Sequence, residues 1–244
     1  MEGMIFAAGL GTRLRPLTDD RPKALVKLKG RTLLERVVRG MAEAGIRRIV
    51  VNIHHFADMV ERELETMDTG GAEIVLSDER KLLMDTGGGL KKAAGLFTPG
   101  SPVLIHNVDI WSELDLKGLM SFYEKDPVYA LMVTKAAERG RVLEFDGEGC
   151  LSGWMNTETG EKKVARATFN ISRQRSFCGI QIVSPDFISG ISGTGVFSII
   201  DEYLRQARNR DIKEYPYTGG FADLGTVAAL ERTERMLEMR EVRD

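Results

Sequence analysis

Two glycines separated by one residue follow a short apolar segment near the start of the chain. Gly9 and Gly11 lie in the run GLGTRLRPLT at residues 9–18, directly after an expected strand at residues 4–8. Glycine lets backbone N–H groups approach an anion closely, and open α/β sheets bind ligands in the loops that follow their strands. The third glycine of the dinucleotide fingerprint and the lysine of the Walker motif are absent. The run therefore indicates a different phosphate-binding turn, with Arg13 beside it.

A lysine and two aspartates could supply the other charges that phosphate chemistry needs. Lys23 follows a proline and precedes an apolar run, so the same end of the sheet can hold its ammonium group. Asp109 follows the apolar segment 103–106, where a carboxylate is costly unless a cation neutralises it. Asp223 precedes a helix that Thr226 can cap, which leaves its carboxylate free. Because hard oxygen ligands suit Mg²⁺ bound jointly with phosphates, we expect the two aspartates to converge around that ion.

Three successive glycines open an amphipathic segment in the first half of the chain. They occupy residues 87–89 within the run DTGGGLKKA. A flexible helix entry is the simplest interpretation of this run. A glycine inside a helix costs about 1 kcal/mol relative to alanine, however, so three in succession imply that another group must come close.

These motifs together resemble the signature of sugar-1-phosphate nucleotidyltransferases. The run FAAGLGTRLRPLT at residues 6–18, followed by PKALV at residues 22–26, matches the family pattern AAGxGTRLxPLT and then PKPL, with Ala24 as the main departure. DTGGG at residues 85–89 and NVDIW at residues 107–111 are similar to the ETGGG and NGDVW forms of the N-acetylmuramate 1-phosphate uridylyltransferase (MurU-like) subgroup. An aspartate and a valine stand where that subgroup has glutamate and glycine.

The resemblance implies a role for each matching residue. The implied catalytic residues are Arg13, Lys23, Asp109 and Asp223, of which Asp109 and Asp223 bind Mg²⁺. The implied nucleotide contacts are Ala7, Ala8, Gly9, Gly11, Thr12, Thr86, Gly87 and Gly88. The implied sugar contacts are Asn52, Asn107 and Gly179.

The implied activity transfers a nucleotidyl group from a nucleoside triphosphate to a sugar 1-phosphate, with pyrophosphate as the second product. UDP-N-acetylmuramate is the expected nucleotide sugar. Other interpretations stay open: a guanylyltransferase acting on mannose-type or heptose 1-phosphate, a glycosyltransferase, and a non-catalytic module that binds nucleotide sugars. Many family members also carry an E-K-P lysine that grips the sugar phosphate, and this chain has no counterpart. Its substitute could be Lys162, Lys163, Arg173 or Arg175.

The spacing of apolar residues predicts the elements that position these groups. In the first half, short apolar runs alternate with amphipathic ones, which predicts a Rossmann-like mixed, mostly parallel α/β sheet with helices on both faces. Extended segments then follow one another, which predicts antiparallel additions. One domain is expected, with a nucleotide-binding half (1–119) and a sugar-binding half (120–244). The polar run 153–176 is expected to be a functional flap or poorly ordered.

Particular segments are assigned as follows. The expected strands are 4–8, 48–52, 73–76, 103–106, 129–134, 141–145, 177–183 and 213–216. The expected helices are 32–45, 56–67, 88–97, 196–209 and 226–240.

The composition limits the partners. The chain has 244 residues, with 34 basic against 36 acidic side chains and a net charge of -2, so no overall field favours nucleic acid or an anionic membrane. The N-terminus lacks the pattern of a signal peptide, and no apolar run approaches the roughly 18 residues of a membrane span. Cys150 and Cys178 fit no metal or redox spacing and are expected to be reduced packing residues. These features favour a cytoplasmic enzyme.

Overall fold

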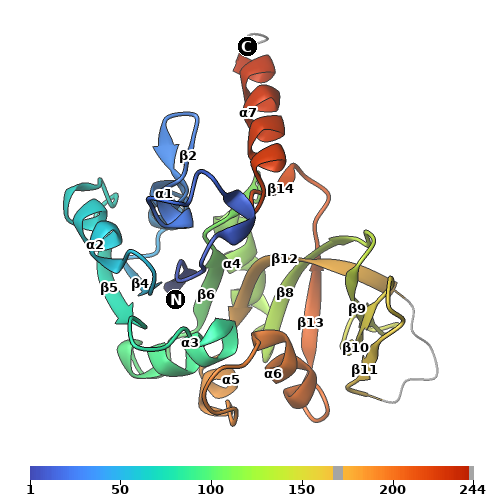
Figure 1. Ribbon diagram of the computed structural model, residues 1–244. Coiled ribbons are helices and arrows are strands. Elements are labelled where there is room, and N and C mark those ends of the chain that lie inside the picture. Colours follow the sequence, from blue (N-terminus) through green and yellow to red (C-terminus); the bar gives the residue numbers. More distant parts are fainter. Residues whose placement is uncertain (167–172, 242–244) are drawn as a thin grey trace.

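Parallel strands from the first half of the chain form one side of a central sheet (Figure 1). The computed structural model describes residues 1–166 and 173–241. These strands lie side by side in the order β6 (Val103–Asn107), β1 (Glu2–Phe6), β4 (Arg48–Ile53) and β5 (Glu73–Asp78). Phe6 is in register with both Asn52 and Asn107. The carboxyl ends of the strands therefore meet at one end of the sheet.

Helices cover both faces of this parallel region. Successive strand residues point to opposite faces, so Ile5 belongs to one apolar core and Met4 to the other. The core with Ile5 includes residues of α1 (Leu33–Glu43), α2 (Ala57–Thr66), α4 (Leu116–Lys125) and α7 (Val227–Glu241). The core with Met4 includes residues of α3 (Asp85–Ala93), α5 (Pro185–Ser189) and α6 (Ile199–Gln206).

Helix α1 shows how the local sequence sets an element. The Thr32 side chain accepts a hydrogen bond of 3.1 Å from the Glu35 backbone N–H, which caps the first turn as predicted. The apolar residues at helical spacing, Leu34, Val37, Val38 and Met41, are all buried. These apolar residues pack the helix against the sheet, while its opposite face carries charged residues.

The second half adds mainly antiparallel strands to the same sheet. The long strand β12 (Arg173–Val183) pairs with β6 and joins the two parts. It also pairs with β8 (Ala130–Ala136) and β9 (Arg141–Phe145), and β9 continues to β10 (Leu151–Asn156) and β11 (Lys162–Val164). Strand β13 (Ile212–Pro216) pairs with β8 in parallel.

Short elements complete the connections. β7 (Ile110–Ser112) pairs with β14 (Phe221–Asp223), and β2 (Lys27–Leu28) pairs with β3 (Arg31–Thr32). One-turn helices lie at η1 (Thr12–Leu14), η2 (Lys23–Leu25) and η3 (Ala94–Leu96).

The predicted mixed α/β sheet with helices on both faces is confirmed, and several segments differ from the prediction. Helix α3 begins at Asp85 rather than at residue 88, and the one-turn helix η3 follows it. The polar run 153–176 is largely sheet in its described part, because β10 and β11 pair with each other and residues from 173 onward belong to β12. Residues 167–172, on which part of that prediction falls, lie outside the described residues. Helix α6 begins at Ile199 rather than at residue 196, because Ser198 caps it. No helix in the described part of the chain is long and apolar enough to cross a membrane.

Candidate active site

Lys23 and Asp109 face each other at the carboxyl end of the parallel strands. Lys23 opens the turn η2, and its Nζ lies 2.6 Å from Oδ2 of Asp109, which follows β6 after one intervening residue. Only 15% of the lysine side chain and 11% of the aspartate side chain are exposed. The structure therefore brings a cation and a carboxylate predicted to work on phosphate into direct contact, although 86 positions separate them.

Asp223 lies beside Asp109 because two short strands pair there. In the pairing of β14 with β7, Asp223 is in register with Ile110, and the Leu224 N–H donates to the Asp109 carbonyl at 2.8 Å. Thr226 accepts a hydrogen bond from the Ala229 N–H at 3.3 Å, the capping task expected of it. The two aspartates predicted to converge are thus neighbours at one end of the sheet.

Gly11 shapes the loop that carries Arg13. Its backbone is left-handed, with φ of 67°, and a Cβ there would lie 3.0 Å from Cβ of Lys23. The loop then places the Arg13 guanidinium close to Asp223: a Cβ on Gly225 would lie 2.6 Å from Nη2 of Arg13 and 2.8 Å from Oδ1 of Asp223. Thr12 opens the turn η1 within this loop. Arg13 therefore lies near Asp223 as Lys23 lies near Asp109, and the backbone bond from Leu224 to Asp109 joins the two pairs.

A cavity of about 420 Å³ opens beside this cluster. Its size falls in the range of small-molecule sites. Apolar side chains mix with polar and charged ones in its lining, which comprises Phe6, Ala8, Gly9, Lys23, Asn52, Leu83, Asp85, Thr86, Asn107, Asp109 and Val196. Most of these residues are predicted nucleotide contacts, sugar contacts or catalytic residues. They come from different strand ends, which is the arrangement of a ligand site in an open α/β sheet.

Asn52 lines the cavity and also holds the glycine loop, while its predicted contact with a sugar stays a prediction. Only 3% of the residue is exposed, and its Oδ1 accepts hydrogen bonds from the backbone N–H groups of Ala7 (2.7 Å) and Ala8 (3.2 Å). The backbone N–H groups of Ala7 and Ala8 therefore already have a partner in the protein, and contact of these two residues with a nucleotide stays a prediction. Gly9 has no such bond among those described and lines the cavity.

The triple glycine makes room for protein rather than for ligand. The N–H groups of Gly87 and Gly88 both donate to the Phe197 carbonyl, at 2.9 and 3.2 Å. A Cβ on Gly87 would lie 2.5 Å from the Phe197 ring, and one on Gly88 would lie 2.5 Å from the Gly195 carbonyl. Neither glycine lines the cavity, whereas Thr86 does. The backbone N–H groups of Gly87 and Gly88 are therefore occupied by protein, and contact of these glycines with a nucleotide stays a prediction.

Gly179 lies next to the Asn107 side chain. Gly179 has φ of 68°, and a Cβ there would approach Nδ2 of Asn107 to 2.7 Å. Glycine at position 179 thus leaves the Asn107 side chain its place in the lining of the cavity. Contact of these two residues with a sugar stays a prediction.

The cations proposed as substitutes for the E-K-P lysine are all paired with carboxylates. Lys162 contacts Glu144 at 3.0 Å, and Lys163 contacts Asp201 at 2.8 Å. Arg173 and Arg175 both contact the carboxylate of Glu214, at 2.9 and 3.0 Å. None of the four lines the cavity.

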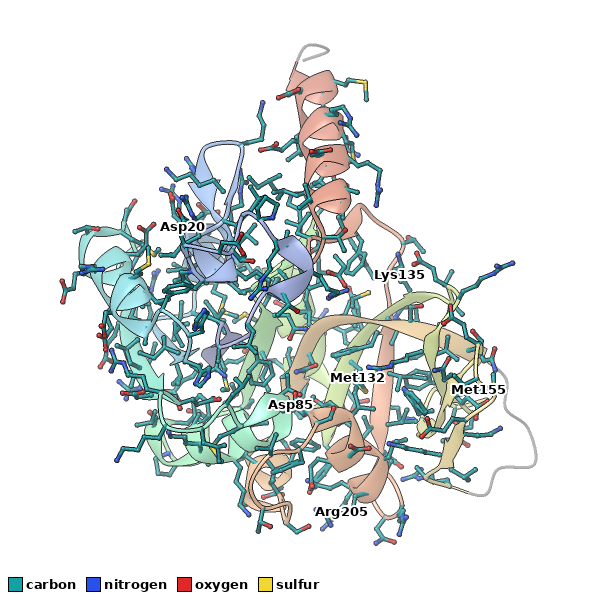
Figure 2. The ribbon with its side chains drawn as sticks, in the orientation of Figure 1. Asp20, Asp85, Met132, Lys135, Met155 and Arg205 are labelled. Carbon is teal, nitrogen blue, oxygen red and sulfur yellow. The ribbon has the colours of Figure 1, made fainter. Side chains whose placement is uncertain are left out.

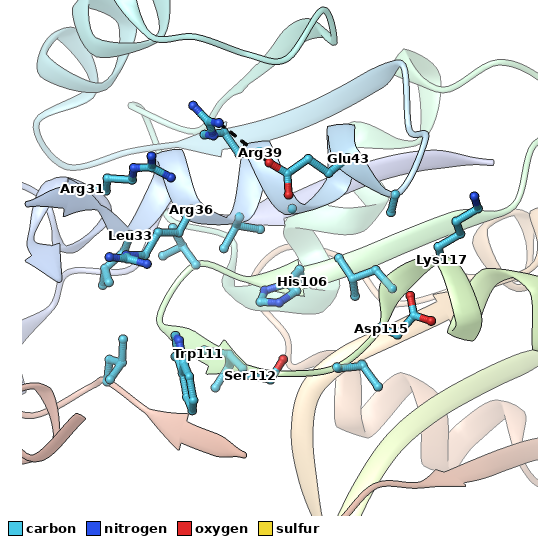
Figure 3. A pocket seen from close by; sticks show the side chains of 18 residues that line it. Arg31, Leu33, Arg36, Arg39, Glu43, His106, Trp111, Ser112, Asp115 and Lys117 are labelled. Atoms are coloured by element: carbon cyan, nitrogen blue, oxygen red, sulfur yellow. Dashed lines mark ion pairs between the residues drawn. The ribbon is translucent and has the colours of Figure 1, made fainter. Parts of the chain in front are cut away.

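A second cavity of about 490 Å³ lies on the other side of the aspartate loop (Figure 3). It is bounded by α1 and by the segment from β6 to α4, and its lining includes His106, Trp111 and several arginines. Arg39 pairs there with Glu43 at 3.8 Å, and Arg36 donates to the Leu28 carbonyl at 3.0 Å. Neither Lys23 nor the Asp109 carboxylate lines it, so the smaller cavity is the candidate active site.

One buried residue of the site was missed by sequence analysis. Glu79 follows β5 and is fully buried, and its carboxylate accepts hydrogen bonds from Asn52 and from the Met84 backbone. An acidic residue directly after a buried strand was the available signal, the same one that pointed to Asp109. Glu79 was not singled out because its charged neighbours Asp78 and Arg80 make the run resemble an exposed turn.

Comparison with known proteins identifies the class to which this fold and site belong. Residues 2–145 match the profile of the nucleotidyl transferase family, and the chain therefore belongs to that family. The match includes the glycine loop, Lys23 and Asp109.

Individual relatives narrow the comparison. An N-acetylmuramate alpha-1-phosphate uridylyltransferase from Caulobacter vibrioides is 48% identical over 113 residues, which are 45% of this chain and 46%, or about half, of that protein. The enzyme of the same name from Neisseria meningitidis serogroup B is 26% identical over 236 residues, 97% of this chain and 98% of that protein.

A solved structure matches the whole fold. A UDP-glucose pyrophosphorylase in complex with UDP-glucose superposes with a TM-score of 0.80 at 18% identity, over 98% of this chain and 99% of that one. At this identity the likeness confirms the fold.

Proposed function

We propose that this chain transfers a nucleotidyl group from a nucleoside triphosphate to a sugar 1-phosphate. The contact of Lys23 with Asp109, with Asp223 on the adjoining strand pair, carries the proposal. A cation and a carboxylate meet beside a cavity at the strand ends, where nucleotide ligands of open α/β sheets bind, and a second aspartate lies on the adjoining strand pair. Membership of the nucleotidyl transferase family supports the reaction class.

The reaction is a single displacement. An oxygen of the sugar phosphate attacks the α-phosphorus of the triphosphate, a new P–O bond forms, and the bond to the leaving pyrophosphate breaks. A phosphate monoester is already anionic near neutral pH, so the attack needs no general base. Catalysis then depends on positioning and on neutralising charge. Lys23 and Arg13 are the cations placed to neutralise the triphosphate and its leaving group.

Asp109 and Asp223 are the residues that would hold Mg²⁺. Two carboxylates at neighbouring backbone positions offer hard oxygen ligands, and Mg²⁺ commonly takes one or two carboxylates together with substrate phosphates. The described residues contain no cluster of three or more histidine, cysteine, aspartate or glutamate side chains that would suggest another metal. When bound, the ion would polarise the α-phosphate and offset its charge.

N-acetylmuramate 1-phosphate and UTP are the proposed substrates. The DTGGG and NVDIW runs resemble that subgroup, and the two relatives described above carry its name. The product would serve cell-wall synthesis in the cytoplasm. Both cysteines are free and buried, which fits this location.

A substrate matrix tests the proposal. The purified chain is incubated with Mg²⁺ and each combination of UTP, GTP, CTP, ATP or dTTP with N-acetylmuramate, glucose, mannose or heptose 1-phosphate, and pyrophosphate is measured. The highest kcat/KM is expected for UTP with N-acetylmuramate 1-phosphate. A preference for GTP with mannose or heptose 1-phosphate would replace the substrate but keep the reaction. No pyrophosphate from any pair would contradict the function and favour a binding module or a glycosyltransferase.

A further inference from the structure

Glu79 is a buried carboxylate that connects segments on both sides of the cavity. None of its surface is exposed, and no ion pair of Glu79 is found among the residues that the structure describes. Its Oε1 accepts a hydrogen bond of 2.8 Å from Nδ2 of Asn52, and its Oε2 accepts one of 3.0 Å from the Met84 backbone N–H. A buried carboxylate is costly unless its oxygens are satisfied, so these two bonds hold it in place.

Asn52 continues this connection to the glycine loop. Two backbone donors, the N–H groups of Ala7 and Ala8, converge on its Oδ1. They fix the orientation of the amide, since only the oxygen can accept, and the NH₂ group must therefore face Glu79. An unbroken chain of hydrogen bonds thus runs from the loop after β1, through Asn52 at the end of β4, to the segment after β5.

Helix α3 packs directly against this pair. A Cβ on Gly89 would lie 2.8 Å from Oε1 of Glu79 and 3.1 Å from Nδ2 of Asn52. The third glycine of the triple run is therefore explained by the pair, as the first two are explained by Phe197 and Gly195. The backbone of helix α3 thus lies against the hydrogen bond between Glu79 and Asn52, with no space for a side chain at position 89.

The two segments joined in this way are opposite parts of the lining of the candidate active site. Ala8 and Gly9 line the cavity from the loop after β1, and Leu83, Asp85 and Thr86 line it from the segment after β5. Neither Glu79 nor the occupied amides of Ala7 and Ala8 need to touch a ligand. Glu79 does not line the cavity, and both hydrogen-bonding groups of Asn52 are directed at protein, so the bond between the two acts on binding through the spacing of these segments.

We propose that Glu79 and Asn52 form a strut of positioning residues, in which an amide-to-carboxylate bond sets the spacing of the two nucleotide-binding segments and thereby the affinity for the triphosphate. This inference rests on the proposed function. Because Lys23, Asp109 and Asp223 lie on other elements, the strut acts on triphosphate binding more than on the chemical step.

Exchanging the two functional groups provides the test. In Glu79→Gln, one of the two acceptor oxygens is replaced by an NH₂ group. If this NH₂ faces Asn52, two donors oppose each other. If it faces Met84, the Met84 N–H loses its acceptor. In Asn52→Asp, two carboxylates face each other. In the double variant, the introduced amide can accept from the Met84 N–H and donate to the introduced carboxylate. The other oxygen of that carboxylate still accepts from Ala7 and Ala8, so the chain of bonds is restored with its polarity reversed.

Three quantities are measured. Calorimetry gives the Kd for UTP with Mg²⁺, and steady-state kinetics show whether KM for UTP or kcat changes. Hydrogen exchange reports on the backbone of residues 7–9 and 79–86. Each single variant is expected to raise Kd and KM about tenfold, the effect of an unpaired buried polar group, with kcat changed less than threefold. Exchange should rise in both segments. The double variant is expected to return to within about threefold of the wild-type Kd, with exchange restored.

Glu202→Gln is the matched control, because Glu202 is also a buried carboxylate that accepts hydrogen bonds, from Arg205 and Gln206. Arg205 lies at the lower edge of the molecule in Figure 2, away from Asp85. This variant should lower the stability and leave the Kd for UTP unchanged. The strut proposal would be wrong if the single variants kept the wild-type Kd, or if the double variant lost as much binding free energy as the two single variants together. In either case the wild type would still be active. A wild type that binds no nucleoside triphosphate would instead remove the proposed function, and the role of the strut with it.

Discussion

The parallel and antiparallel parts of the sheet use buried charged groups in opposite ways. At the end of the parallel strands, Lys23 and Asp109 pair with each other and still line a cavity. In the antiparallel part, the Glu214 side chain is 3% exposed, and its carboxylate is enclosed by Arg173, Arg175 and Thr134. The first pair can exchange its partner for a ligand, whereas the second set is complete without one.

This difference comes from the geometry of the strands. Parallel strands end at the same side of a sheet, so the side chains that follow them converge around a common opening. In the second half, charged side chains lie along the strands rather than beyond their ends. Arg173 and Arg175 on β12 reach across β8 to Glu214 on β13, where opposite charges satisfy one another. We therefore expect phosphate chemistry in the parallel part, although both parts are rich in charge.

The largest expected effect is on turnover in the parallel part. Replacing Asp109 with Asn keeps the shape of the side chain but removes the charge that pairs with Lys23 and would bind Mg²⁺. We expect kcat to fall by about 1000-fold or more, since the charge on the reacting phosphates is no longer offset. Pyrophosphate release under saturating substrate measures it. Near-normal kcat in a folded Asp109→Asn protein would show that the site has been misplaced.

The second largest expected effect is on stability at low pH and concerns His106. This residue lies in β6, the strand shared by the two parts, and is in register with Ile5 and Ile180. Burial lowers the pKa of His106 to about 4, although its hydrogen bond to the Asn107 carbonyl and the charge of Asp109 act in the other direction. The folded protein therefore holds a neutral imidazole at pH values where the unfolded chain, with a pKa near 6.5, takes up a proton. Stability from this residue is present above pH 6.5 and is lost as the pH falls toward 4.

That loss is expected to reach about 3 kcal/mol at pH 4. Urea unfolding of the wild type and of His106→Gln at pH 7 and at pH 4 to 5 measures it, and the variant should lose less stability on acidification. His55→Gln serves as the control, because that ring is exposed. Equal acid losses in the wild type and in His106→Gln would show that the histidine does not hold a neutral ring in the folded protein.

The smallest effect is in the antiparallel part and should spare turnover. Glu214→Gln removes the charge shared by Arg173 and Arg175, each at 3.0 Å or less. Breaking this largely buried set is expected to cost about 2 kcal/mol of stability, less than for fully buried pairs because the arginines are partly exposed. The kcat should stay within twofold. Urea unfolding and steady-state assays test both, and a loss of kcat comparable to that of Asp109→Asn would remove the distinction between the two parts.

Most elements of the fold could be predicted because their signals are local. The capping residues and apolar stripe of α1, and the apolar runs of β1, β4 and β6, lie within a few positions of one another. The strands β10 and β11 could not be predicted in this way. Strand β11 lies at the margin of the sheet with all its residues exposed, so no apolar alternation is required there, and β10 beside it has no regular alternation of buried and exposed residues.

By itself the sequence determined the glycine loop, Lys23, and the two aspartates, because the types and order of these residues are specific to one chemistry. Only the tertiary structure decided which polar groups remain available to a ligand. The amides of Ala7 and Ala8 are taken by Asn52, and the glycines at 87 and 88 face Phe197 and Gly195. Such partners come from strands and segments tens of residues away, and a hydrogen-bonding group can be assigned to a ligand only when the fold shows that no part of the protein has already satisfied it.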